Sequence, residues 1–167
     1  MLYRTTFFSP LGVLTLYSDG TAIAAITMPV WRHQPTAESM EYDDLPVFQH
    51  AKSWLENYFT GAAPSSFPPI QAVGTPFRQQ IWNILQEIPH GSALTYGDVA
   101  RKLEERTGHH TSPRAVGNAV GQNPVAIMIP CHRVLGAGSS LTGFGGGLEA
   151  KRFLLELEGI SFTTDPI

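Results

Sequence analysis

The residues of this chain best suited to chemistry are Cys131 and its two neighbours, His132 and Arg133. Cys131 is the only cysteine among 167 residues, so it cannot form an internal disulfide, and one sulfur is too few for a thiolate zinc site. The commoner role of a lone cysteine is that of a small, inert, buried side chain. Here the adjacent histidine offers a proton acceptor and the adjacent arginine offers positive charge, which together activate a thiol. We therefore predict that Cys131 is a nucleophile.

A histidine that accepts a proton needs a hydrogen-bond acceptor on its other ring nitrogen to hold its orientation. Neighbouring residues of an extended chain point to opposite sides, so His132 reaches Cys131 only if the chain turns or a water bridges the two. The sequence leaves three candidates for the orienting carboxylate: Glu149, Glu156 and Glu158.

The elements that must position these residues fall into two parts, and the pattern predicts an α/β (α+β) fold. Residues 1–74 are expected to form a small N-terminal lobe. Segments 3–8, 11–17 and 22–28 are rich in β-branched and aromatic residues and are separated by turn signals, which is typical of an antiparallel sheet. Residues 47–59 carry apolar side chains at helical spacing, and the proline- and glycine-rich segment 61–74 is expected to be a linker.

Residues 75–167 are expected to form a mostly helical C-terminal domain. Thr75 and Pro76 begin a helix that runs to about residue 88, and Thr95 with Asp98 resembles a capping box that begins a helix over 96–105. Ser112 begins a short helix over 114–122, so these last two helices suggest a helix-turn-helix. The apolar run 125–129 predicts a short buried strand that leads to Cys131, and residues 148–158 predict a final helix.

The charges are unevenly distributed along the chain, although the net charge is only −3. Residues 1–74 carry three basic and six acidic side chains, residues 75–153 carry eight basic and five acidic, and the last fourteen residues carry three acidic. The middle of the chain therefore has a modest positive charge that would meet phosphates, but this is a weak electrostatic signal.

The helix predicted over 114–122 has unusually small side chains, and its first turn carries Arg114. Glycine destabilises a helix interior by about 1 kcal/mol, so its repeated use needs a reason. One explanation is close packing against the protein core, and the other is close approach to the surface of a partner. Both would hold if different sides of the helix serve them. The small residues are Ala115, Gly117, Ala119 and Gly121.

The residues around Cys131 also match a known family. Asn123-Pro124, the apolar run, Pro130-Cys131-His132-Arg133-Val134, Gly146-Gly147-Leu148 with Lys151, and Glu158-Gly159 closely resemble the O6-alkylguanine-DNA alkyltransferases, also called methylated-DNA–protein-cysteine methyltransferases. The resemblance extends from about Thr75 to Gly159. The N-terminal lobe is similar to the family only in outline.

The resemblance implies direct DNA repair by an irreversible, single-turnover methyltransferase. An alkyl group would move from O6 of guanine, with O4-alkylthymine as a second candidate substrate, to Cys131. His132 would take the thiol proton through a water, and Glu158 would orient His132. Asn123 would brace the turn that carries the cysteine. Tyr96 would donate a hydrogen bond to the departing base.

The resemblance further implies that double-stranded DNA is bound through its minor groove, with the damaged base flipped out. Arg114 would fill the space that the base leaves. The groove surface would include Thr95, Tyr96, Ala115, Gly117 and Ala119. The substrate pocket would include Val134, Phe144 and Gly145, and Phe144 stands where some relatives carry tyrosine, which leaves the preferred alkyl size open.

The remaining expectations concern the oligomeric state, cofactors and metals, and the location of the protein in the cell. The resemblance implies a monomer without a cofactor or metal. The zinc-binding cysteines that some relatives carry in this lobe are absent here, and His109 and His110 are expected to be exposed to solvent. The start of the chain is unlike a signal peptide and there is no long apolar run, so we expect a cytoplasmic protein with a reduced cysteine.

Two alternatives from other classes stay open at this point. The first is a DNA-binding module without chemistry, but relatives of that kind carry tryptophan in place of the cysteine. The second is a cysteine hydrolase, but such enzymes usually bring the histidine from far along the chain, and a helix-turn-helix would have no purpose there.

Overall fold

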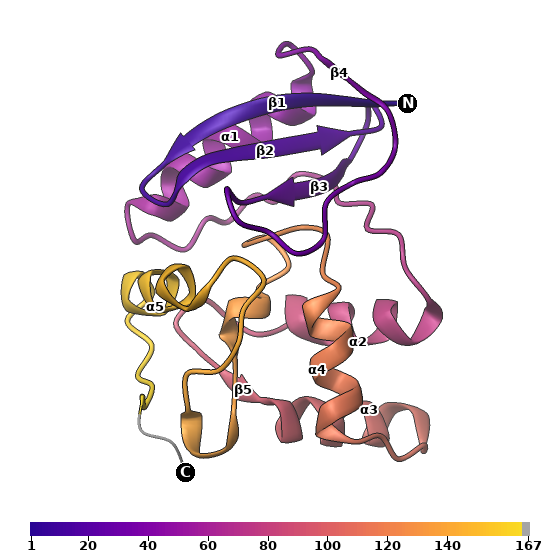
Figure 1. Ribbon diagram of the computed structural model, residues 1–167, viewed down its shortest axis with the longest axis vertical. Helices are drawn as coiled ribbons and strands as arrows, with labels where there is room; N and C mark the ends of the chain where they lie inside the picture. The colour runs from indigo at the N-terminus through magenta and orange to yellow at the C-terminus, as the bar shows by residue number, and fades with distance from the viewer. Residues whose placement is uncertain (165–167) are drawn as a thin grey trace.

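The N-terminal lobe is a four-stranded sheet with one helix packed on one face (Figure 1). The computed structural model describes residues 1–164 and gives the strand order β3-β2-β1-β4. The strands β1 (Leu2–Ser9), β2 (Gly12–Ser18) and β3 (Ile23–Thr27) pair antiparallel, as predicted. The short strand β4 (Ser39–Glu41) pairs parallel with β1 and was not predicted, because its segment is polar and only three residues long.

Helix α1 (Pro46–Phe59) covers the sheet with the apolar face that its sequence predicts. Phe48, Ala51, Leu55 and Tyr58 are completely buried, and they recur at a spacing of three to four residues. On the sheet, Leu14 and Leu16 alternate toward this helix and are also completely buried. Burial of these side chains is the main force that holds α1 against the sheet.

Within residues 1–164 the C-terminal domain contains four further α-helices, and three of them begin at the caps predicted from the sequence. Arg78 N donates to Thr75 Oγ1 at the start of α2 (Pro76–Gln86), and Ala115 N donates to Ser112 Oγ at the start of α4 (Pro113–Gly121). The capping box of α3 (Tyr96–Thr107) is complete, because Thr95 and Asp98 each accept from the other's backbone N–H. Gly108, with φ of 72°, ends α3 and begins the turn to α4.

The segment that leads to Cys131 is a buried turn, so the strand predicted over 125–129 is wrong. Val125 forms a single parallel bridge with Ile26, and the chain then turns. Residues 123–130 are all buried. An apolar run indicates burial but does not by itself distinguish a strand from a turn enclosed by the core.

The end of the domain returns the chain to the cysteine. Cys131–Arg133 form one turn of 3₁₀-helix, which leads into β6 (Val134–Leu135), and β6 pairs parallel with β5 (Leu94–Thr95). A second short 3₁₀ segment (Ala137–Ser139) and a glycine-rich loop precede α5 (Leu148–Leu157). The last three residues of the C-terminal domain lie outside the described residues. No helix in the described part of the chain is long and apolar enough to cross a membrane.

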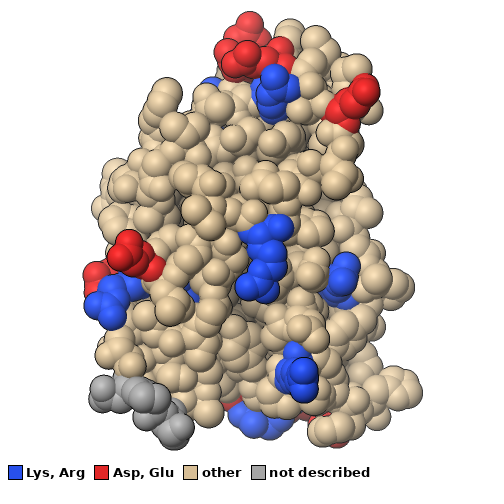
Figure 2. Space-filling view, in the orientation of Figure 1, with Lys and Arg blue, Asp and Glu red and all other residues tan. Residues whose placement is uncertain are grey.

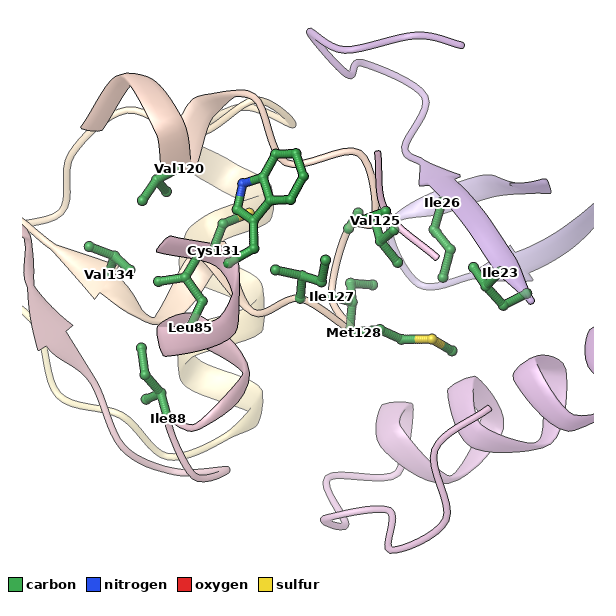
Figure 3. Packing of buried hydrophobic residues seen from close by; sticks show 14 of the residues in the cluster. Ile23, Ile26, Leu85, Ile88, Val120, Val125, Ile127, Met128, Cys131 and Val134 are labelled. Carbon is green, nitrogen blue, oxygen red and sulfur yellow. The ribbon is translucent and has the colours of Figure 1, made fainter. Parts of the chain in front are cut away.

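The two lobes share one hydrophobic core. Both Ile70 and Val125 form parallel bridges with β3, so the predicted linker is partly ordered against the sheet. Ile26 N donates to Pro124 O, and Ala126 N donates to Ile26 O. Figure 3 shows Ile26 beside Val125 where the lobes meet, with Cys131 farther along the same core beside Leu85. The sheet edge therefore fixes the start of the turn that carries the cysteine.

Candidate active site

The turn before Cys131 is held by Asn123. Its side-chain Nδ2 donates to Ile129 O at 2.8 Å and to Cys131 Sγ at 3.2 Å, and its Oδ1 accepts from Val125 N at 2.9 Å. Ile127 in this turn has φ of 70°, a left-handed conformation that is strained for a β-branched residue. Such a conformation persists only where the surrounding structure enforces it. Asn123, 1% exposed, supplies part of that enforcement.

Behind Cys131, Glu158 is the centre of a buried hydrogen-bond network. Its Oε2 accepts from His132 Nε2 at 2.6 Å and from the Tyr58 hydroxyl at 2.6 Å. Its Oε1 accepts from Arg133 Nε at 2.8 Å and from Gly91 N at 3.1 Å. Of the three acidic candidates from the sequence, the structure therefore selects Glu158, since Glu149 and Glu156 are exposed.

The network sets the protonation states that a base catalyst needs. Burial alone would raise the pKa of Glu158, but the hydrogen bonds from His132, Arg133 and Tyr58 hold that pKa well below its usual range. Burial lowers the pKa of His132, so the imidazole is neutral at neutral pH. Because Nε2 donates to Glu158, Nδ1 is the basic nitrogen. It is buried and has no hydrogen-bond partner within residues 1–164.

The thiol of Cys131 is protonated at rest, whereas the sequence suggested a thiol activated by its two neighbours. Burial raises the pKa of Cys131 to about 11, although the hydrogen bond from Asn123 and the charge of Lys151 both lower it. The prediction that Arg133 supplies positive charge to the thiol is wrong, since its guanidinium binds Glu158 and the carbonyl of Ile88. Arg133 instead balances the charge of the buried carboxylate.

Lys151 supplies the charge that the sequence assigned to Arg133. Its side chain is completely buried, and its Nζ donates to Val134 O at 2.6 Å. Burial lowers its pKa to about 8, while the interaction with Cys131 opposes that shift. The burial of Lys151 could have been predicted from the sequence, because Lys151 lies on the apolar side of α5 together with Leu154 and Leu155.

In front of Cys131 lies a cavity of about 220 Å³, which we call the Cys131 cavity. The predicted residues Tyr96, Gly117, Phe144 and Gly145 line it. Tyr96 is half-buried, and burial raises the pKa of its hydroxyl, which keeps the hydroxyl a hydrogen-bond donor. The other lining residues are Trp31, Arg32, Val120, Gly121, Thr142 and Gly143.

Three other predicted site residues do not line the Cys131 cavity. Val134 does not line the Cys131 cavity; it is completely buried in β6, where its carbonyl binds Lys151. Ala119, 2% exposed, faces the core and accepts a hydrogen bond from Trp82 Nε1 at 2.9 Å, so it offers no groove surface. The side chain of Thr95 is occupied by the capping box of α3.

Helix α4 presents its small residues to two different surroundings, the protein core at Ala119 and the Cys131 cavity. Gly117 and Gly121 line the Cys131 cavity, and a Cβ atom on Gly117 would lie 3.8 Å from the ring of Tyr96. Ala115 is half-buried and Arg114 is exposed in the first turn. On the face in Figure 2, basic side chains lie in the middle and lower part around α4, and acidic side chains gather near β4.

The histidines at 109 and 110 lie in the exposed turn between α3 and α4. His110 Nδ1 lies 3.6 Å from Glu104 Oε2, and both side chains are at least half exposed. Within residues 1–164, no group of three or more histidine, cysteine or acidic side chains is close enough to hold a metal ion.

Tyr58 is a site residue that the sequence did not predict. Tyr58 is completely buried on α1, and its hydroxyl reaches Glu158 across 100 residues of sequence. Burial and the charge of Glu158 raise the pKa of Tyr58, so the hydroxyl stays protonated. The sequence marked Tyr58 only as part of an apolar helix face, and nothing local indicates a partner so distant in the chain.

Comparisons with known proteins identify the family of this chain. The family model described as 6-O-methylguanine DNA methyltransferase, ribonuclease-like domain, matches residues 2–71, and the model for the DNA binding domain of the same proteins matches residues 76–160. A Haemophilus influenzae methylated-DNA–protein-cysteine methyltransferase is 46% identical over 162 residues, which cover 96% of this chain and 88% of the relative. A protein of that name from Methanosarcina acetivorans is 37% identical over 158 residues, with 95% and 99% covered. The crystal structure of Mycobacterium tuberculosis OGT in complex with DNA aligns with a TM-score of 0.83 and 38% identity, covering 94% of this chain and 92% of that one.

Proposed function

Because the chain belongs to the 6-O-methylguanine DNA methyltransferase family, we propose a part for each residue around Cys131 in its reaction. The protein repairs DNA by direct reversal, in which an alkyl group moves from a damaged base to a cysteine of the protein itself. Cys131 is the acceptor, since the chain has no other cysteine. The observation that carries the proposal is that Cys131 stands between the cavity and the buried network of Glu158 and His132.

The proton of the thiol leaves toward His132. No direct hydrogen bond joins the imidazole to the sulfur, so a bridging water carries the proton to Nδ1. The resulting imidazolium is stabilised by the carboxylate of Glu158, which stays ionised. Asn123 donates to the sulfur and Lys151 lies nearby with positive charge, so both stabilise the thiolate as it forms.

The alkyl carbon is attacked by the sulfur, so an S–C bond forms while the bond from that carbon to O6 of guanine breaks. The electron pair of the broken bond stays with the base. The hydroxyl of Tyr96 lines the cavity and donates a hydrogen bond to the ring, which offsets the negative charge that develops there. The product on the protein is a thioether, a poor leaving group, and each molecule therefore reacts once.

The protein meets its substrate in duplex DNA, and helix α4 enters the minor groove. Cys131 is only 4% exposed, so a base still stacked in the duplex does not reach its sulfur, and the alkylated base is flipped into the Cys131 cavity. Arg114 projects from the first turn of α4 and fills the vacated space, while Ala115 and Gly117 allow close approach. O4-alkylthymine is a second substrate, and the protein acts as a monomer in the cytoplasm, where the thiol stays reduced.

The decisive test is the mass of the intact protein after incubation with a duplex that contains one O6-methylguanine. We expect a gain of one methyl group on the peptide that contains Cys131, saturating at one per protein molecule, and no gain in Cys131→Ser. Repeated turnover, or tight DNA binding without a gain of mass in the unmodified protein, would contradict the proposal.

A further inference from the structure

One wall of the Cys131 cavity comes from the N-terminal lobe. Trp31 and Arg32 line this cavity together with residues of the C-terminal domain, although they lie about a hundred residues before Cys131 in the sequence. Both belong to the segment between β3 and β4, outside the part of the chain that matches the DNA binding domain of the family. The shape of the reaction site therefore depends on both lobes.

Trp31 is unusual among its neighbours. It is 7% exposed, whereas every other residue from 29 to 38 is exposed or half-buried, and Val30 beside it is 70% exposed. An indole is the largest side chain available to fill a wall, and it has only two side-chain torsions to fix. This segment, which is otherwise exposed or half-buried, thus directs its one buried residue to the cavity.

Trp31 packs against the glycine-rich loop of residues 143–147. Glycines have wide conformational freedom, so this loop has few side chains of its own to define its position. The ring of Phe144 packs edge-on against Trp31, with centroids 5.5 Å apart. A Cβ atom on Gly145 would lie 3.6 Å from the same indole, and one on Gly146 would lie 2.5 Å from Met28 Sδ.

The N-terminal lobe therefore holds the loop that carries Phe144, at close range, through Met28 and Trp31. Phe144 and Gly145 line the Cys131 cavity beside Trp31. A rigid aromatic pair in van der Waals contact does not yield to a larger ligand without loss of packing. Any group that enters the cavity with the base must fit in front of this pair.

We propose that Trp31 is a specificity-determining residue that limits the size of the alkyl group transferred to Cys131. The proposal rests on the proposed function, since the cavity must receive an alkylated base. Removal of the indole enlarges the cavity and releases Phe144, so bulky alkyl groups gain access while a methyl group, which already fits, gains little. One extra methylene group in an apolar pocket changes the discrimination between two substrates by about 10- to 200-fold.

The test is the ratio of single-turnover transfer rates for two duplexes, one with O6-butylguanine and one with O6-methylguanine. In Trp31→Ala we expect this ratio to rise about tenfold, with Trp31→Phe in between. The matched control is Val30→Ala, whose side chain is exposed next to Trp31 and lies outside the cavity lining. It should leave both rates unchanged.

An unchanged ratio in Trp31→Ala, with methyl transfer retained, would overturn the inference but not the proposed function. An equal rise in Val30→Ala would also overturn it, because the effect would then belong to the segment as a whole. Thermal melting establishes that each variant folds, and Trp31→Phe and Trp31→Leu decide by the same ratio if Trp31→Ala does not fold. A wild-type protein that transfers neither group would overturn the inference and the proposed function together.

Discussion

The two sides of Cys131 are built in opposite ways. On the side of Glu158, which we call the network side, both carboxylate oxygens are used and four groups donate to them. On the side of the Cys131 cavity, the side chains of Tyr96 and Phe144 are half-buried and the nearby Arg114 is exposed without a hydrogen-bond or ion-pair partner in the described chain. The difference separates the groups that move the thiol proton from the groups that meet the substrate.

This separation has an energetic reason. A carboxylate and a guanidinium group are buried within the network side, and such charges stabilise a fold only when they are paired. The residues that line the Cys131 cavity include no buried charged group, so this requirement does not apply there. Variants on the network side should therefore affect both folding and the rate with every substrate, whereas a variant of an exposed side chain beside the cavity, such as Arg114, should affect binding and leave stability nearly unchanged.

The strongest test of the network side is Glu158→Gln. The variant leaves Arg133 buried without its counter-ion, so we expect a loss of about 3–5 kcal/mol in the free energy of unfolding. Without the carboxylate that orients and stabilises the imidazolium, transfer should slow by about 10²- to 10⁴-fold. Denaturant unfolding and single-turnover kinetics measure the two effects.

The same pair makes stability depend on acid. The pKa of Glu158 lies below its usual 4.5 in the folded state, so its stabilisation is present above pH 4.5 and is lost as the pH falls through the folded value. Glu158→Gln should lack this acid-dependent part of the stability. A variant as stable as the wild type, with the same acid dependence, would contradict the described network.

On the cavity side, Arg114→Ala should slow transfer without destabilising the fold. Flipping a base requires a few kcal/mol, and a side chain that fills the vacated space offsets part of it. We expect transfer from duplex DNA to slow by about 10- to 30-fold, while transfer from the free base O6-methylguanine is unchanged. Arg78→Ala, on α2, is the control. Equal losses with the duplex and the free base would show that Arg114 does not act through the flipped base.

A smaller effect on the network side is expected from Tyr58→Phe. The variant removes one of the two hydrogen bonds to Glu158 Oε2 and keeps the ring in the core. A hydrogen bond to a charged group contributes about 1.5–3 kcal/mol, shared between folding and transfer, so we expect transfer to slow by about tenfold or less. The control is Tyr42→Phe, which is 45% exposed. A Tyr58→Phe variant that loses selectivity between alkyl groups while keeping its stability would contradict the assignment of Tyr58 to the network side.

The smallest effect concerns pH. Burial lowers the pKa of His132 below 6.5, and the imidazole accepts a proton only while it is neutral. We therefore expect the wild-type transfer rate to be constant from neutral pH down to 6.5. Rate measurements in buffers matched for salt provide the check, and a decline that begins above 6.5 would mean that His132 is not held neutral by burial.

The sequence predicted the elements well where local signals are strong. Caps at Thr75, Thr95 and Ser112 placed three helix starts correctly, because a cap is an interaction within one turn of the chain. The lone cysteine with its neighbouring histidine also located the site. Strand prediction failed at 125–129, where burial in a turn and burial in a strand leave the same apolar pattern.

The site itself could be predicted only in part, because much of it is assembled from distant segments. Tyr58 and Trp31 come from the N-terminal lobe, and no periodicity or spacing connects either of them to Cys131. Adjacent residues were also misleading: Arg133 follows the cysteine by two positions, yet its guanidinium binds Glu158. The resemblance placed Phe144 in the pocket, but Val134, three residues from Cys131, is enclosed in the core.

The ionisation of Cys131 is the most direct measurement of how the two sides cooperate. Because the protein has a single thiol, ultraviolet thiolate absorbance, corrected with Cys131→Ser, reports this residue alone. Burial should keep the thiol protonated at neutral pH, with a pKa of about 11. The thiol is then activated only when His132 takes its proton. A thiolate that titrates below the ordinary value of 9.0 in the resting protein would contradict this activation.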